Sequence, residues 1–210
     1  MIPIALTPAD ALIIVDLQND FLPGGALGVP HGDDVIAPIQ QLIDLYQSHG
    51  LPIYASRDWH PVGHCSFTQQ GGPWPIHCVA GSAGAAFSSA VPVEQVAIVI
   101  SKATTVAKDA YSAFNGTGLG EQMRARGIAR VAVCGLATDY CVLNTARDAL
   151  AEGFAALLVR DAIRAVDVQP GDGDRAIAAM LAAGALPVHV DQAGLRAEAA
   201  HRQDSSVGIF

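Results

Sequence analysis

Six short apolar runs recur along the chain, and segments with helical periodicity separate most of them. The runs occupy residues 11–15, 51–56, 96–101, 131–135, 154–159 and 186–190. Within each run the hydrophobic residues follow one another instead of alternating with polar ones, which indicates strands that are covered on both faces. The pattern therefore predicts an α/β fold of three layers (α/β/α), in which helices cover both faces of a mainly parallel sheet.

Four helices are expected between these strands, at 33–49, 118–126, 139–151 and 172–183. A glycine follows each of them, namely Gly50, Gly127, Gly153 and Gly184. Glycine is the residue best suited to the left-handed conformation in which many helices end, so these positions fit helix C-termini.

One domain is expected to span residues 1–210, because 51% hydrophobic content and 15% charged content suit a single large core. Residues 58–95 are rich in glycine, proline, tryptophan and histidine and lack clear periodicity. Such long loops inside compact domains are usually functional, and here the composition indicates a metal-binding loop region. The polar tail 196–210 is expected to be mobile or to contact a neighbouring subunit.

The formal net charge of −8 argues against nucleic acid and membrane surfaces as partners, and a small molecule fits better. The first residues lack a basic start and a cleavage pattern, and Asp16 ends their apolar run, so a cytoplasmic location is expected.

The four cysteines are not expected to form disulfides, because a domain with a large hydrophobic core needs no disulfide framework. Each cysteine is therefore a core residue, a ligand or a nucleophile: Cys65, Cys78, Cys134 and Cys141.

Reactive side chains follow four of the apolar runs. They are Asp16, the pair Asp58 and His60, Lys102, and Cys141 after a short turn. In open parallel sheets, ligands bind outside the carboxyl ends of the strands. Any one of these residues has an ordinary structural explanation, but their combination at one edge of one sheet indicates a catalytic site.

Cys141 is predicted to lie in the first turn of the helix 139–151, with Thr138 as its cap. The helix dipole lowers a thiol pKa there, and the free backbone N–H groups of the same turn suit an oxyanion. A base or a cation is also needed, and Asp16 and Lys102 are the candidates. The alternative is that Cys141 is a buried helix cysteine, as Cys134 within its apolar run is expected to be.

Asp58 and His60 are two positions apart on an extended segment, so their side chains point the same way. His77, returning from the long loop, completes a three-ligand metal set with open positions. The alternatives are a structural zinc site that recruits Cys65 or Cys78, or no metal at all. Because tight C-x-x-C spacing is absent, the open set is favoured; His64 is either a fourth ligand or an outer hydrogen-bond donor.

Six segments together resemble the nicotinamidase/pyrazinamidase branch of the isochorismatase-like cysteine hydrolases. They are VDLQNDFLPGGAL (15–27), SRDWHPVGHCSF (56–67), GPWPIHCVAGSAG (72–84), SKAT (101–104), DAYSAF (109–114) and CGLATDYCVLNTARDA (134–149). The resemblance covers roughly residues 10–190, and the motifs occur in the family's order.

The resemblance implies a role for each matching residue. It implies a catalytic triad of Asp16, Lys102 and Cys141, an oxyanion hole of the Ala137 and Cys141 amides with a cis Leu136–Ala137 peptide, an aromatic pocket of Phe21, Leu27, Trp74 and Tyr111, and metal ligands Asp58, His60 and His77. His64 matches a position that binds metal in some members only and is left out of the set.

The implied reaction is the metal-dependent hydrolysis of a small aromatic amide, nicotinamide and also pyrazinamide, to the acid and ammonia through a thioester. The Asp/His set accepts zinc, iron or manganese as one divalent ion, which contacts the pyridine nitrogen in the family. Members occur as monomers and in larger assemblies, so a homo-oligomer is possible.

Three other functions remain open at this point. Within the superfamily these are an N-carbamoyl amidase and an isochorismatase acting on a vinyl ether, although isochorismatases generally lack the cysteine and the metal motif. The third alternative comes from another class of protein, namely a non-catalytic metal-binding or nucleotide-binding α/β module. Triad and metal residues lying far apart in the fold would favour that last alternative.

Overall fold

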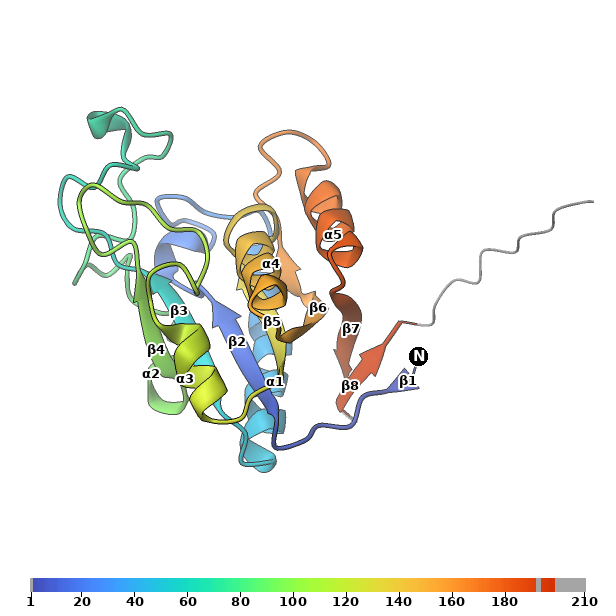
Figure 1. Ribbon diagram of the computed structural model, residues 1–210. Helices are drawn as coiled ribbons and strands as arrows, with labels where there is room; N and C mark the ends of the chain where they lie inside the picture. Colours follow the sequence, from blue (N-terminus) through green and yellow to red (C-terminus); the bar gives the residue numbers. More distant parts are fainter. Residues whose placement is uncertain (1, 192–193, 199–210) are drawn as a thin grey trace, which may run out of the picture.

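The computed structural model describes residues 2–191 and 194–198, and an eight-stranded sheet forms the centre of this part of the chain (Figure 1). Its strands are β1 (Ile2–Pro3), β2 (Asp10–Val15), β3 (Ile53–Asp58), β4 (Ile98–Lys102), β5 (Arg130–Leu136), β6 (Ala155–Arg164), β7 (Leu186–Asp191) and β8 (Gly194–Ala197). The order across the sheet is β1-β8-β7-β6-β5-β2-β3-β4, and all pairings from β7 to β4 are parallel.

Helices cover both faces of this sheet. They are α1 (Ile36–Ser48), α2 (Val93–Val96), α3 (Leu119–Ala125), α4 (Leu143–Ala151) and α5 (Asp172–Ala182). In Figure 1, α1 lies behind the strands while α3, α4 and α5 lie in front of them. The three-layer α/β/α architecture with a mainly parallel sheet is therefore confirmed.

Strand β2 shows why the sheet is buried on both faces. Its residues alternate between two hydrophobic cores: Leu12 and Ile14 pack in the core that contains α1, and Ile13 and Val15 pack in the core of α3 and α4. All six residues of β2 are buried, Asp10 among them. A continuous apolar run is the sequence pattern that such a central strand requires.

Two differences from the sequence prediction occur at the β1 edge. The strands β1 and β8 were not expected, and β8 pairs antiparallel with both β7 and β1. Residues 196 and 197, where the tail that is mobile or contacts a neighbouring subunit was expected to begin, are part of β8; residues 199–210 of that tail lie outside the described residues. Strands of two and four residues carry too little periodicity to be recognised from sequence.

The long segment 58–95 has little regular structure, as expected, but its ends belong to other elements. Asp58 is the last residue of β3, and α2 begins at Val93. Between them the described backbone contains one short 3₁₀ turn, Thr68–Gln70. Among the described residues no helix has the length and apolarity needed to cross a bilayer.

Candidate active site

The three residues proposed as a catalytic triad meet at the carboxyl edge of the sheet. Asp16 directly follows β2, Lys102 ends β4, and Cys141 lies in a π-helical turn, η4 (Thr138–Val142), between β5 and α4. Asp16 has a φ angle of 46°, a left-handed conformation that costs a non-glycine residue about 1–3 kcal/mol and is concentrated at functional sites. The cis peptide between Leu136 and Ala137 is present at the start of this turn.

The buried ammonium group of Lys102 is the centre of the cluster. Its Nζ atom lies 3.0 Å from Asp16 Oδ2, 2.5 Å from Asp58 Oδ1 and 3.4 Å from Cys141 Sγ. Nζ also donates a hydrogen bond to the Ala110 carbonyl oxygen over 3.1 Å. Burial alone would lower the pKa of Lys102, but the two carboxylates outweigh it and raise that pKa well above its ordinary value, so the lysine remains charged.

The buried carboxylate of Asp16 lies beside the thiol of Cys141. Its Oδ1 atom accepts a 2.7 Å hydrogen bond from Ser56 Oγ, and its carboxylate lies within 4.8 Å of Cys141 Sγ. Burial raises the pKa of Asp16, and the positive charge of Lys102 opposes that effect without cancelling it. A carboxylate with a raised pKa is a stronger proton acceptor than an exposed aspartate.

The protonation of Cys141 differs from the sequence expectation. The helix start was expected to lower the thiol pKa, but burial raises the pKa of Cys141 well above its ordinary value, and the nearby Lys102 only partly offsets this. Burial thus favours the neutral thiol over the thiolate. A thiol needs a proton acceptor to become a nucleophile, and the Asp16 carboxylate lies within 4.8 Å of the Cys141 sulfur.

Three donor groups converge next to this cluster: Asp58, His60 and His77, whose ligand atoms all lie within 4.8 Å of one another. His60 Nε2 lies 3.2 Å from His77 Nε2 and 3.7 Å from Asp58 Oδ2. All three residues are buried. Burial and the neighbouring imidazoles lower the pKa of His60 to about 3, which keeps its ring neutral.

The hydrogen bonds of the two rings fit a metal ion. His60 Nδ1 lies 3.3 Å from the Ala103 carbonyl and His77 Nδ1 lies 2.8 Å from the Pro75 carbonyl. A carbonyl oxygen only accepts, so both Nδ1 atoms carry the proton and both Nε2 atoms present a lone pair. Two lone pairs and a carboxylate that converge suit a cation, and hydrogen bonds from Nδ1 to backbone carbonyls are typical of metal-binding histidines.

His64 is engaged elsewhere. Its Nδ1 accepts hydrogen bonds from the backbone N–H and hydroxyl of Ser66, and its Nε2 donates to the Lys108 carbonyl over 3.2 Å. The ring stacks on His60 with 4.2 Å between centroids. Both ring nitrogens are therefore occupied by protein groups, which leaves His64 outside the convergent set.

A second convergent group, Asp16, Asp58 and Cys141, has a different explanation. The Lys102 ammonium lies within 3.4 Å of all three side chains and already supplies their positive charge. The structural zinc alternative is not supported either, because neither convergent group among the described residues contains Cys65 or Cys78.

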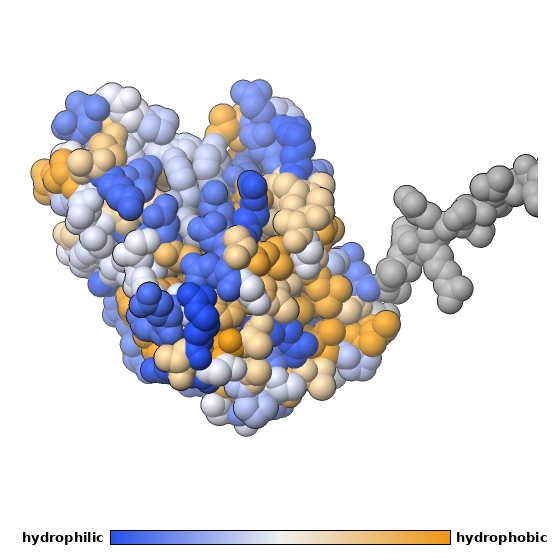
Figure 2. All heavy atoms as spheres, in the orientation of Figure 1, coloured by the Kyte–Doolittle hydropathy of each residue, from blue (hydrophilic) through white to orange (hydrophobic). Residues whose placement is uncertain are grey.

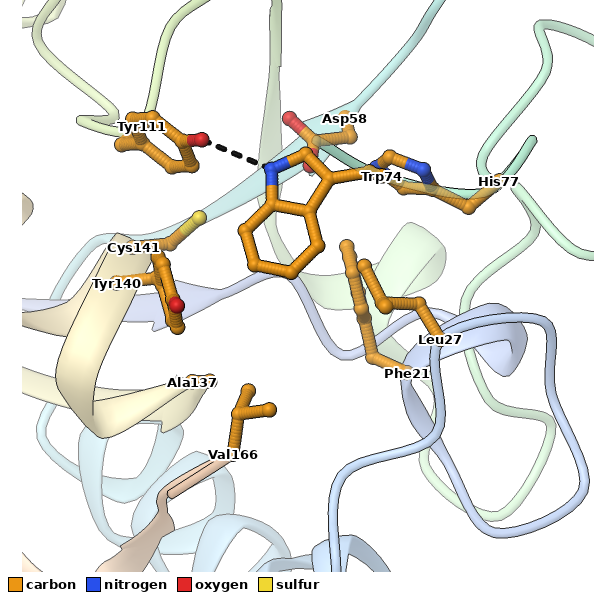
Figure 3. A pocket seen from close by; sticks show the side chains of 10 residues that line it. All are labelled: Phe21, Leu27, Asp58, Trp74, His77, Tyr111, Ala137, Tyr140, Cys141 and Val166. Atoms are coloured by element: carbon orange, nitrogen blue, oxygen red, sulfur yellow. Dashed lines mark hydrogen bonds between the residues drawn. The ribbon is translucent and has the colours of Figure 1, made fainter. Parts of the chain in front are cut away.

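A small pocket opens beside Cys141 (Figure 3). Phe21, Leu27, Trp74 and Tyr111, the four residues that the resemblance implied, all line it; its other lining residues are Asp58, His77, Ala137, Tyr140, Cys141 and Val166. Cys141 and two of the three candidate metal ligands, Asp58 and His77, thus line the same aromatic pocket. In Figure 2, the surface dips at this end of the molecule, between the long loops and the segment that precedes α5.

Aromatic contacts close one side of the pocket. Trp74 Nε1 donates a 2.9 Å hydrogen bond to Tyr111 Oη, and the Trp74 ring meets Tyr140 edge-on at 5.0 Å (Figure 3). Sequence reasoning missed Tyr140 and Val166 as pocket residues. The place of Tyr140 next to Cys141 was a usable signal, whereas Val166 is brought in only by the path of the chain after β6.

Two polar side chains hold the loops around the metal donors. Gln18, fully buried, accepts a hydrogen bond from the Asp58 N–H and donates to the Asp58 and Ala85 carbonyls over 2.8 to 2.9 Å. Asp20 accepts the N–H of Cys78 over 2.7 Å, beside His77. Sequence reasoning did not single out either residue.

Comparisons with known proteins identify the family of this chain. The isochorismatase domain model matches residues 10–192. The nicotinamidase of Escherichia coli (strain K12) is 42% identical over 199 residues, which cover 85% of this chain and 93% of that protein.

Two solved structures share the fold. The pyrazinamidase of Pyrococcus horikoshii in complex with zinc has a TM-score of 0.83 and 47% identity, covering 87% of this chain and 99% of that one. PnC1 from L. infantum in complex with nicotinate has a TM-score of 0.81 and 37% identity, covering 89% of this chain and 96% of that one. The chain therefore belongs to the isochorismatase domain family, in its nicotinamidase/pyrazinamidase branch.

Proposed function

We propose that this chain is a metal-dependent cysteine amidohydrolase that converts nicotinamide, and also pyrazinamide, to the carboxylic acid and ammonia. The observation that carries the proposal is the Cys141 thiol at the wall of an aromatic pocket, with Lys102 3.4 Å from its sulfur. The pocket walls suit a flat aromatic ring, which favours nicotinamide over a small aliphatic N-carbamoyl compound. The named activities of the E. coli and P. horikoshii relatives support the same substrates.

The first half-reaction forms a thioester. Asp16 accepts the proton of Cys141 as the sulfur attacks the carboxamide carbon, and Lys102 stabilises the negative charge shared by the cluster. The backbone amides of Ala137 and Cys141 hold the oxyanion; one such donor is typically worth about 100- to 1000-fold in rate. The C–N bond then breaks, and Asp16 returns the proton to the departing nitrogen, which leaves as ammonia.

The second half-reaction releases the acid. Asp16 accepts a proton from a water molecule whose oxygen attacks the thioester carbon, and the same two amides hold the second oxyanion. The C–S bond then breaks, and the proton passes from Asp16 to the Cys141 sulfur. Each residue of the triad thus returns to its starting state.

Asp58, His60 and His77 would hold one divalent ion, for which zinc, iron and manganese are candidates and the zinc complex of the P. horikoshii relative supports zinc. When bound, the ion supplies Lewis acidity and positive charge beside the pocket. Of this chain's own residues, Asp58 would link the two halves of the site, because one of its oxygens contacts Lys102 while the other faces His60.

An assay of ammonia release with parallel chromatography of the acid product tests the proposal. The wild type is expected to hydrolyse nicotinamide and pyrazinamide, with N-carbamoylsarcosine as the competing substrate. Cys141→Ala is expected to abolish turnover while the circular dichroism spectrum is unchanged, and Cys65→Ala, at a half-buried thiol near the metal donors, serves as the matched control. Turnover by Cys141→Ala, or a preference for the carbamoyl substrate, would overturn the proposal.

A further inference from the structure

The carboxylate of Asp139 joins the turn that carries Cys141 to a distant segment of the chain. Asp139 lies in η4, two residues before Cys141. Its Oδ1 atom accepts the backbone N–H of Val166 and its Oδ2 atom accepts the N–H of Asp167, both over 2.9 Å. Hydrogen bonds to a charged acceptor are about twice as strong as neutral ones, so this is a firm two-point clamp.

The segment held by this clamp forms part of the proposed substrate pocket. Val166 lines the pocket together with Ala137 and Cys141, and its side chain lies beside Ala137 in Figure 3. Val166 belongs to the connection between the end of β6 at Arg164 and the start of α5 at Asp172. Val166 and Asp167 belong to no helix or strand, and their backbone N–H groups donate to the Asp139 carboxylate instead of to a neighbouring strand.

The same connection is fixed at its other end by a second carboxylate. Asp167 has a φ angle of 52°, and its Oδ1 atom accepts the N–H of Gly173 in the first turn of α5 over 2.8 Å. In addition, Gly173 is so close to Ala165 that a Cβ atom there would collide with it. Hydrogen bonds thus connect the segment around Val166 to η4 on one side and to the N-terminus of α5 on the other.

We propose that Asp139 is a positioning residue that fixes the Val166 wall relative to the Cys141 sulfur and thereby sets the size of the aromatic ring that the pocket accepts. This inference rests on the proposed function. Because Val166 lines the pocket beside Ala137 and Cys141, and protein interiors are closely packed, a displacement of Val166 by the width of a methyl group changes the fit of a ring substantially. Asp139 touches the wall and not the substrate, so it acts on specificity through Val166.

Asp139→Asn is the most informative variant, because it keeps the shape of the side chain. An amide has one acceptor oxygen, so its NH₂ group must face one of the two N–H donors, and one hydrogen bond is lost. We expect kcat/KM for nicotinamide to fall on the order of tenfold, mainly through KM. Asp44→Asn, at an exposed aspartate on α1 that accepts one hydrogen bond from Gln40, is the matched control.

Ring specificity separates this role from simple loss of stability. Nicotinamide and 5-methylnicotinamide are compared as substrates, and Asp139→Asn is expected to shift the ratio of their kcat/KM values several-fold towards the methylated ring. Val166→Ala should shift the ratio in the same direction. In the double variant, Asp139→Asn should add no further shift, since the wall through which it acts is already removed. An additive double variant, or an unchanged ratio in Asp139→Asn, would overturn the inference.

A measurement without substrate keeps this inference separate from the proposed function. Hydrogen exchange is expected to accelerate at least tenfold in Asp139→Asn at one of the two backbone amides, Val166 or Asp167, namely the one that loses its acceptor, with β2 and β5 unchanged. Unchanged exchange at those two amides shows that the clamp is absent and overturns the inference. If the wild type hydrolysed neither nicotinamide nor its methyl derivative, the proposed function would fail instead, while the exchange result would still decide whether Asp139 holds the wall.

Discussion

The Nζ atom of Lys102 lies 3.4 Å from the Sγ atom of Cys141, and the same ammonium group contacts the carboxylate of Asp58. The proposed nucleophile therefore shares its cation with a proposed metal ligand. A change in either half of the site alters the electrostatic potential at the other, because low-dielectric surroundings screen these charges weakly. The triad and the metal donors are best regarded as a single charged cluster.

Removal of the Lys102 charge is expected to destabilise the metal-free protein as well as inactivate the enzyme. Lys102→Met keeps most of the side-chain volume but leaves two buried carboxylates without their cation, which typically costs about 3–5 kcal/mol. Urea denaturation in the presence of a chelator measures the change in the free energy of unfolding. Lys108→Met, at an exposed lysine in the following loop, is the control. A stability loss below about 1 kcal/mol would show that the ion pairs contribute little.

Metal content should depend on His60 and not on His64. In His60→Ala, elemental analysis after incubation with zinc and gel filtration is expected to find much less than one equivalent of metal. His64→Ala should retain close to one equivalent, since both ring nitrogens of His64 bond to protein groups. His189→Ala, at a half-buried histidine of β7 paired with Glu198, is the control. Equal losses in His60→Ala and His64→Ala would contradict the three-ligand set.

Loss of the hydrogen bond between Trp74 and Tyr111 is expected to weaken substrate binding. Trp74→Phe keeps an aromatic ring at the pocket but removes the indole N–H, and a net neutral hydrogen bond is worth about 0.5–1.5 kcal/mol, so KM for nicotinamide should rise severalfold. Trp59→Phe, whose indole instead stacks under Arg57 at 3.6 Å, should leave KM unchanged. Equal KM values for the two variants would argue against a role for Trp74 in the pocket.

Acid stability should depend on Asp10. Burial opposes ionisation of Asp10, but hydrogen bonds from Arg130 and Thr7 outweigh it and hold the pKa below its ordinary value. A depressed pKa in the folded state stabilises the protein above the unfolded pKa of about 3.9, and this stabilisation is lost as the pH falls below that value and through the lower pKa of the folded state. Asp10→Asn should therefore lose less stability between pH 5 and pH 3 than the wild type does.

Urea midpoints of the metal-free proteins at several pH values provide the measurement. At pH 6 the variant should be the less stable protein, because hydrogen bonds to a charged group contribute about 1.5–3 kcal/mol. The two stability curves should converge as the pH falls. Curves that stay parallel from pH 5 to pH 3 would show that Asp10 is not responsible for the acid sensitivity.

Most of the sheet was predictable because its central strands are buried on both faces. The run at 11–15 corresponds to β2, which has one further residue, Asp10. Because Asp10 is polar, the hydrophobic pattern did not include it in the strand. The edge strands β1 and β8 could not be found, since strands this short are defined by their partners and not by their own periodicity.

The site was predictable where chemistry is concentrated at strand ends. Asp16, Lys102 and Cys141 follow three strands that lie close together in the sheet, so the parallel topology itself brings them together. The supporting residues were harder to find. Asp139 and Gln18 act by binding backbone groups far away in sequence, and such partners are set by tertiary structure alone.

The pairing of β1 with β8 has a practical consequence for handling the protein. These two strands occupy one margin of the sheet, whereas Asp16 follows β2 and Lys102 ends β4, towards the opposite margin. A surface tether or reporter attached at residue 2 would thus be anchored on the side remote from the catalytic cluster. Immobilised in that way, the protein should present its crevice to the flowing solution.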